Sequence, residues 1–135
     1  MSARRRTVQV RRVYDLPRSD DGIRVLVDRL WPRGVSKAAA RFDQWCPQIA
    51  PSTQLRRWYG HDPMLFDEFT VRYVAELGAA ARSRALAGLV SIAGRGMLTL
   101  LTATRDVTIS EAAVLAAYIS SDAAFDRVHS GDRPG

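Results

Sequence analysis

The fold follows from the stretch IRVLVDRLWPRG, residues 23–34 of a chain of 135 residues. Val25, Leu26 and Val27 lie at the centre of a nearly continuous apolar and β-branched run, which is typical of a strand buried on both faces of a sheet. Charged and aromatic side chains follow, and Pro32 and Gly34 end the strand. We expect a buried strand over residues 23–30 with polar side chains at its carboxyl end.

Two further strands are predicted from short apolar runs. Residues 7–14 carry Val8 and Val10 in alternation, and residues 97–103 form a compact apolar run of strand length. Residues 16–22 contain proline, serine, two aspartates and glycine, so they predict a turn between the first two strands.

Helices are predicted from capping residues and from apolar spacing. Asp62 before Pro63 has the order of an N-cap and a first helical residue, and the helix that it opens is expected to end near Gly78. Thr108 and Glu111 have the spacing of a capping box, which predicts a last helix up to residue 119. The other predicted helices lie at residues 36–46, 52–59 and 86–93, with Ser36 and Ser52 as N-caps of the first two.

The order of these elements indicates the fold class. Long helical connections between apolar strands favour parallel pairing and a sheet covered by helices. We therefore predict an α/β fold, a three-layer sandwich with a small, at least partly parallel sheet covered by helices. The length suits one domain, and we expect a basic disordered arm at residues 1–6, the domain at residues 7–120 and a polar C-terminal tail at residues 121–135.

Composition narrows the class of protein. Hydrophobic residues make up 47% and charged residues 25%, as in an ordinary globular protein. Cys46 is the single cysteine and no apolar run approaches about 20 residues, so we expect a cytoplasmic protein with no disulfide and no membrane span. The net charge of +6 suits a partner that bears phosphates, but half of it equals the charge of Arg4, Arg5 and Arg6.

The end of the predicted strand 23–30 is the first candidate site. Open α/β sheets bind ligands beyond the carboxyl ends of their strands, where this chain places Asp28, Arg29, Trp31 and Arg33. We expect the arginines to hold an anion and the tryptophan to form a wall. The structural alternative is that Asp28 and Arg29 form a buried pair at the sheet edge while Trp31 fills a gap in the core.

Two other segments carry candidate residues. His61 and Asp62 precede the helix at Pro63, and helix N-termini favour anions while a histidine exchanges protons near neutral pH. Arg105 follows the last strand and offers a forked cation for a carboxylate or a phosphate. In the structural alternative, Asp62 only caps the helix, His61 only hydrogen-bonds its loop, and Arg105 is an exposed loop charge.

Several chemistries are excluded by inspection. With two histidines and one cysteine the chain lacks the pattern of a structural zinc site, and we predict no metal. There is no phosphate-binding glycine loop that ends in Lys-Ser or Lys-Thr, no dinucleotide fingerprint and no Gly-x-Ser-x-Gly elbow, so we predict no cofactor.

Around the candidate residues at positions 28–33, 61–62 and 105, the sequence resembles a bacterial and archaeal family known as domain of unknown function 488, in its YeaO-like branch. The resemblance implies an α/β domain and no established reaction, and it carries over to Asp28, Arg29, Trp31, Arg33, His61 and Asp62. Its motifs are the block at residues 24–34, Ala50-Pro51-Ser52, Leu55-Arg56, Trp58, Gly60-His61-Asp62-Pro63, Phe69, Arg72, Tyr73, Leu98-Thr99-Leu100-Leu101 and Arg105-Asp106.

One position departs from that family. Its members often carry histidine and asparagine near the last helix, where this chain has Ile109 and Ser110. If that pair takes part in chemistry in those relatives, this chain binds a ligand without catalysing a reaction.

Three hypotheses for function remain open on the sequence. The first is a protein that binds a small anionic ligand, phosphorylated or carboxylated, in a pocket of arginine, tryptophan and histidine. The second is a hydrolase or phosphoryl-handling enzyme in which His61 is the acid or base and Asp28 or Asp62 orients it. The third, which is not favoured, is a nucleic-acid-binding accessory protein that uses the arm at Arg4–Arg6. The oligomeric state is not predicted.

Overall fold

A four-stranded parallel sheet forms the centre of the computed structural model, which describes residues 7–121. The order of its strands is β1-β4-β2-β3, so the strand that comes last in the chain lies between the first two. The predicted arm at residues 1–6 and residues 122–135 of the predicted tail lie outside the described residues. The strands are β1 (Val8–Arg12), β2 (Ile23–Leu26), β3 (Gln44–Trp45) and β4 (Leu98–Thr102).

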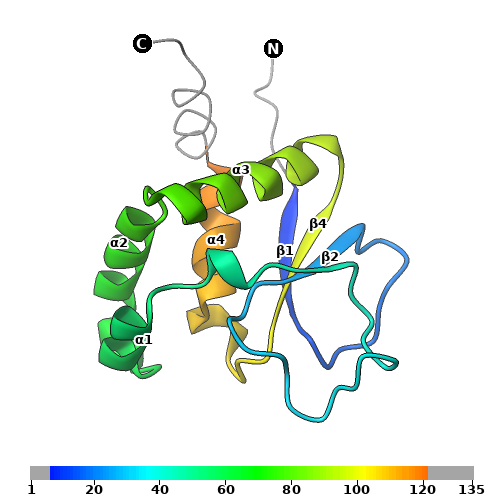
Figure 1. Ribbon diagram of the computed structural model, residues 1–135, viewed down its shortest axis with the longest axis horizontal. Coiled ribbons are helices and arrows are strands. Elements are labelled where there is room, and N and C mark those ends of the chain that lie inside the picture. Colours follow the sequence, from blue (N-terminus) through cyan, green and yellow to red (C-terminus); the bar gives the residue numbers. More distant parts are fainter. Residues whose placement is uncertain (1–6, 122–135) are drawn as a thin grey trace.

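Helices cover one face of this sheet. In Figure 1 they lie to the left of the strands and above them, while the long connections lie to the right. The prediction of a small α/β sandwich with an at least partly parallel sheet is confirmed, and every strand pair is parallel. The α-helices are α1 (Thr53–Tyr59), α2 (Phe66–Glu76), α3 (Ala80–Arg95) and α4 (Glu111–Ser120), with 3-10 helices η1 (Pro47–Ile49), η2 (Pro63–Leu65) and η3 (Val107–Ile109).

The described helices include none that could cross a membrane, because none is both long enough and apolar enough.

All five residues of β4 are buried, and they supply the core on both faces of the sheet. Leu98 and Leu100 pack with the helices in the main core, whereas Leu101 packs on the opposite face with Leu26 and Phe42. Because side chains alternate along a strand, both faces of a buried strand need a cover. The connection that contains Phe42 provides the second cover.

The predicted helix at residues 36–46 is wrong. Ser36 Oγ accepts the Ala39 amide as an N-cap would, but only one turn forms. Further along, the Asp43 carboxylate accepts the Arg24 amide, and Asp43 N donates to Arg24 O. These bonds lead into β3, which pairs with β2. Sheet pairing outweighs the helix preference of the three alanines because nucleation of a short helix is costly.

Two element boundaries also differ from the prediction. The strand expected at residues 23–30 ends at Leu26, because the chain leaves the sheet after the bond from Val27 N to Leu101 O. The capping box at Thr108 and Glu111 does not form. Ser110 Oγ accepts the Ala113 amide and is the N-cap of α4, while Thr108 lies in η3 and donates to Asp106.

Other helix boundaries follow the prediction. Ser52 caps α1, and Gly60 ends it in the left-handed conformation that glycine adopts at low cost. Asp62 Oδ1 accepts the Met64 amide, with Pro63 as the first residue of a 3-10 turn that leads into α2.

Asp21 anchors the amino-terminal ends of the strands through a buried ion-pair cluster. Its carboxylate is 1% exposed and contacts the guanidinium groups of Arg11, at 3.1 Å, and Arg24, at 2.5 Å. Burial alone raises the pKa of Asp21, but hydrogen bonds from the Arg18 amide and from Arg24, together with the charges of Arg24 and Arg11, more than offset it and lower the pKa.

Replacement of Asp21 by asparagine should lower the free energy of unfolding by about 3 kcal/mol at neutral pH, because it leaves Arg24 buried without a counter-charge. The same cluster predicts that wild-type stability falls as the pH drops below 3.8 and through the lowered pKa of Asp21. Urea unfolding measures both effects. Glu68→Gln is the matched control, since the exposed pair of Glu68 with Arg72 is worth only about 0.5 kcal/mol. Equal losses in the two variants would contradict the anchor.

Candidate functional site

A cleft of about 540 Å³ opens beyond the carboxyl ends of β2 and β4. Parallel strands bring polar residues that follow them to one edge of the sheet, which is where such folds bind ligands. The cleft is lined by Tyr14, Asp28, Arg29, Leu30, Trp31, Pro32, Arg33, Pro51, Arg56, Arg57, Tyr59, His61, Phe69, Ala103, Thr104 and Glu111.

Asp28 stands where the two strands separate. Ala103 N, just after β4, donates to Asp28 Oδ2 at 2.8 Å in place of a ladder bond. Trp45 Nε1 donates to the Asp28 carbonyl oxygen at 2.8 Å from the other side. The Asp28 carboxylate is thereby fixed at the floor of the cleft.

Glu111, the first residue of α4, brings a second carboxyl group to Asp28. Asp28 Oδ1 and Glu111 Oε2 are both shielded from solvent, and no donor within residues 7–121 reaches either atom. Burial raises the pKa of Glu111 well above its ordinary value of 4.5, contact with the Asp28 carboxylate raises it further, and Arg56 opposes the shift. Two facing carboxylates repel unless one holds a proton. Glu111 therefore holds its proton to a higher pH than an ordinary glutamate does, and that proton lies beside the Asp28 carboxylate.

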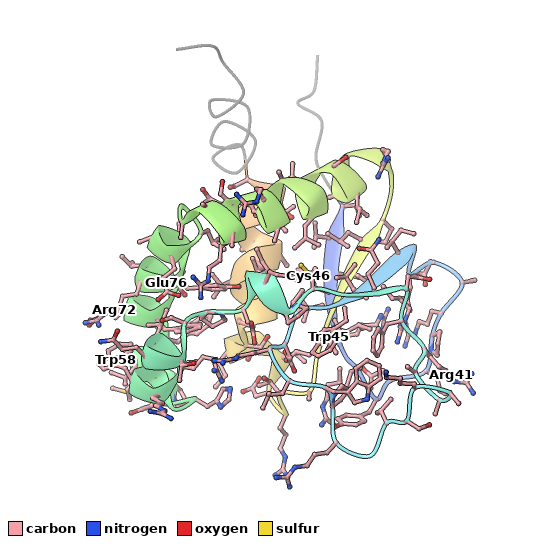
Figure 2. The ribbon with its side chains drawn as sticks, in the orientation of Figure 1. Arg41, Trp45, Cys46, Trp58, Arg72 and Glu76 are labelled. Atoms are coloured by element: carbon pink, nitrogen blue, oxygen red, sulfur yellow. The ribbon has the colours of Figure 1, made fainter. Side chains whose placement is uncertain are left out.

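Helix α1 carries Arg56 and Arg57 to the cleft, and α2 fixes its position. The Glu76 carboxylate accepts both the amide and the hydroxyl of Ser52, at 2.8 and 2.5 Å. On the outer side, the Arg72 guanidinium lies over the Trp58 ring, with Cζ 4.3 Å from the ring centroid. Figure 2 shows these two side chains next to each other. Arg56 Nε is buried without an acceptor among the described residues.

Three exposed arginines stand at the rim of the cleft: Arg29, Arg33 and Arg57. Arg29 donates to the Thr53 hydroxyl. Within residues 7–121 the ion pairs are Arg11–Asp21, Arg24–Asp21 and Arg72–Glu68, so none of the rim arginines has a carboxylate partner. The rim therefore carries positive charge that the described residues do not neutralise.

Trp31 lines the cleft and also packs into the cover of the sheet. Its ring lies 5.2 Å from Phe42 and 5.4 Å from Trp45, between centroids, and its indole N–H donates to the Val35 carbonyl oxygen. Tyr14 donates to the Arg33 carbonyl oxygen at 3.1 Å. These contacts hold the chain from Trp31 to Val35 against the end of the sheet.

The structure brings together five of the predicted site residues and leaves two aside. Asp28, Arg29, Trp31, Arg33 and His61 line the cleft, whereas Asp62 and Arg105 are exposed and are not among its lining residues. Asp28 and Arg29 do not form the ion pair considered as a structural alternative, since Asp28 contacts Ala103 and Glu111 instead.

His61 lies at the edge of the cleft in an unusual backbone conformation. It is exposed, its φ is 56°, and its ring centroid is 5.7 Å from that of Tyr59. Within the described part of the chain no carboxylate forms a hydrogen bond with it, and Asp62 is engaged with Met64. The described residues also contain no group of three or more histidine, cysteine, aspartate or glutamate residues placed to hold a metal ion.

Sequence reasoning missed Glu111, Arg56 and Arg57. The sequence predicts Glu111 only as part of a capping box. The signal that points to a site residue is its position at the start of the helix that follows the last strand. The adjacent pair Arg56-Arg57 lies in the predicted helix at residues 52–59, where apolar spacing does not show which face meets the sheet edge.

The fold and the cleft define a small parallel α/β domain with a polar site at the ends of its central strands. The chain belongs to the domain of unknown function 488 family, because residues 7–133 match the family described as "Inactive DUF488-N3 subclade". An uncharacterised protein of Mycobacterium tuberculosis is 50% identical over 113 residues, 84% of this chain and 93% of its own. The uncharacterised protein YeaO of Escherichia coli is 40% identical over 114 residues, 84% and 97% of the two chains. No solved structure matches significantly.

Replacement of Glu111 by glutamine should flatten the dependence of stability on pH. The folded protein holds a proton on Glu111 that the unfolded chain releases above 4.5, so wild-type stability falls as the pH rises from there toward the raised pKa. Glutamine keeps a neutral donor beside Asp28 and does not titrate. Urea unfolding from about pH 5 to about pH 8 measures the difference. Glu68→Gln, at an exposed carboxylate, should follow the wild-type curve; a parallel curve for Glu111→Gln would refute the raised pKa of Glu111.

Proposed function

We propose that the chain binds a small anionic ligand, phosphorylated or carboxylated, in the cleft and catalyses no reaction there. The observation that supports it is the set of rim arginines, Arg29, Arg33 and Arg57, which have no carboxylate partner within residues 7–121. Guanidinium groups that share one cleft repel one another, and a bound anion relieves that repulsion. Their planar forks suit the oxygens of phosphate and carboxylate groups.

The carboxylates near the rim are engaged elsewhere. Asp28 accepts the Ala103 amide and faces Glu111, while Asp62 accepts the Met64 amide. An internal carboxylate would have made the arginine set a structural ion-pair network, and its absence among the described residues favours a ligand. The cleft volume of about 540 Å³ also suits a small molecule, for which sites of about 300–1,000 Å³ are usual.

Two observations favour binding over catalysis. The matching subclade carries the description "inactive". His61 has no hydrogen-bonded carboxylate within residues 7–121 to orient its imidazole, and Ile109 and Ser110 stand where related sequences are expected to carry histidine and asparagine. A carboxylate that orients the imidazole supports acid–base catalysis by histidine in many enzymes, and its absence within residues 7–121 favours binding.

Replacement of Arg33 by alanine should weaken the binding of inorganic pyrophosphate about ten-fold, the value of one charge-assisted hydrogen bond. Its stability should not change, because the described contact of Arg33 is made by its carbonyl oxygen rather than its guanidinium. Titration calorimetry measures the affinity and urea unfolding the stability. Arg84→Ala, an exposed arginine of α3 away from the cleft, is the control. A loss of stability with no change in affinity, or no binding of pyrophosphate by the wild-type chain, would rule out the proposal.

A further inference from the structure

The cleft is divided into a basic rim and a floor that holds two carboxyl groups beside one guanidinium group. Arg29, Arg33 and Arg57 at the rim are exposed, whereas the facing oxygens of Asp28 and Glu111 are shielded from solvent. A second anionic group that entered as far as the floor would meet the Asp28 carboxylate. The anionic part of a ligand therefore belongs at the rim, and a different chemical group belongs at the floor.

The floor selects a neutral group. The floor sets the Arg56 guanidinium beside two carboxyl groups, and burial together with the Asp28 carboxylate raises the pKa of Glu111 well above its ordinary value, so that this carboxyl group resists ionisation. An ammonium group at the floor would be repelled by the Arg56 guanidinium, and an anion would be repelled by the Asp28 carboxylate. A neutral head group meets neither cost.

The polar atoms at the floor require both donors and acceptors from that neutral group. Within residues 7–121, Arg56 Nε is buried and lacks an acceptor, and Glu111 Oε2 is buried and receives no donor from another residue. A hydroxyl group donates one hydrogen bond and accepts two, so adjacent hydroxyls satisfy a carboxyl and a guanidinium together. Tyr59 and Phe69, whose rings stack with their centroids 4.1 Å apart, are the aromatic residues that line the cleft beside these polar groups.

We propose that the ligand is a sugar phosphate, with its phosphoryl group at Arg29, Arg33 and Arg57 and with its ring hydroxyls at Glu111 and Arg56. This inference rests on the proposed function and names the class of ligand. Free sugar phosphates and nucleotides share the required chemistry, since both carry a phosphoryl group beside a hydroxylated ring. The hydroxyls confer the selectivity, and the rim arginines confer the affinity for the anion.

Titration calorimetry on the full chain at pH 7 tests the selectivity with inorganic phosphate, ribose 5-phosphate, 2-deoxyribose 5-phosphate and adenosine 5′-monophosphate. Ribose 5-phosphate should bind at least about ten-fold more tightly than inorganic phosphate, because hydrogen bonds to charged groups contribute that much. The 2-deoxy sugar should lose part of this advantage. Tighter binding of the nucleotide would identify a nucleotide as the source of the sugar phosphate, and weaker binding would identify a free sugar phosphate.

Variants separate the floor from the rim. Glu111→Ala should abolish the advantage of ribose 5-phosphate and leave the affinity for inorganic phosphate unchanged, whereas Arg33→Ala should weaken both equally. Glu111→Gln, which keeps the shape of the side chain, replaces the alanine variant if that one does not fold, and Glu68→Gln is the control at an exposed carboxylate. Equal wild-type affinities for inorganic phosphate and ribose 5-phosphate would overturn this inference while leaving anion binding intact. No binding of any phosphate probe would overturn both.

Discussion

The burial of β4 on both faces is the constraint on which the rest of the structure depends. A strand with all five residues buried needs neighbours along both edges and covers over both faces. β1 and β2 pair with β4 along its two sides. The helices cover one face of the sheet, and the connection around Phe42 covers the other. The cleft follows from the same constraint, because the chain after β2 and the chain after β4 must diverge into different covers.

The sequence predicted the elements that local chemistry determines. Ser52 and Gly60 bound α1, and the Asp62-Pro63 pair opens the turn before α2, because capping depends on residues only a few positions apart. The failure at residues 36–46 has the opposite cause. Arg24 and Asp43 are far apart in sequence, and their hydrogen bonds turn that segment into the edge of the sheet.

The candidate site was predictable to the same extent. Asp28, Arg29, Trp31 and Arg33 follow one buried strand, and strand ends locate clefts in parallel sheets, so a single segment was enough to find them. Glu111 and Arg56 reach the cleft from two helices whose orientation depends on packing against the sheet. Their meeting with Asp28 is a tertiary contact for which apolar spacing carries no signal.

The short length of β3 affects whether a second copy of the chain can pair with the edge of the sheet. A sheet edge with several free amides and carbonyls is a template on which another chain can add a strand. β3 offers only Gln44 and Trp45 at one edge, and β1 at the other edge carries Arg12 beside Arg11, which is paired with Asp21. A short strand and a charged side chain both disfavour the addition of a strand from a second copy of the chain.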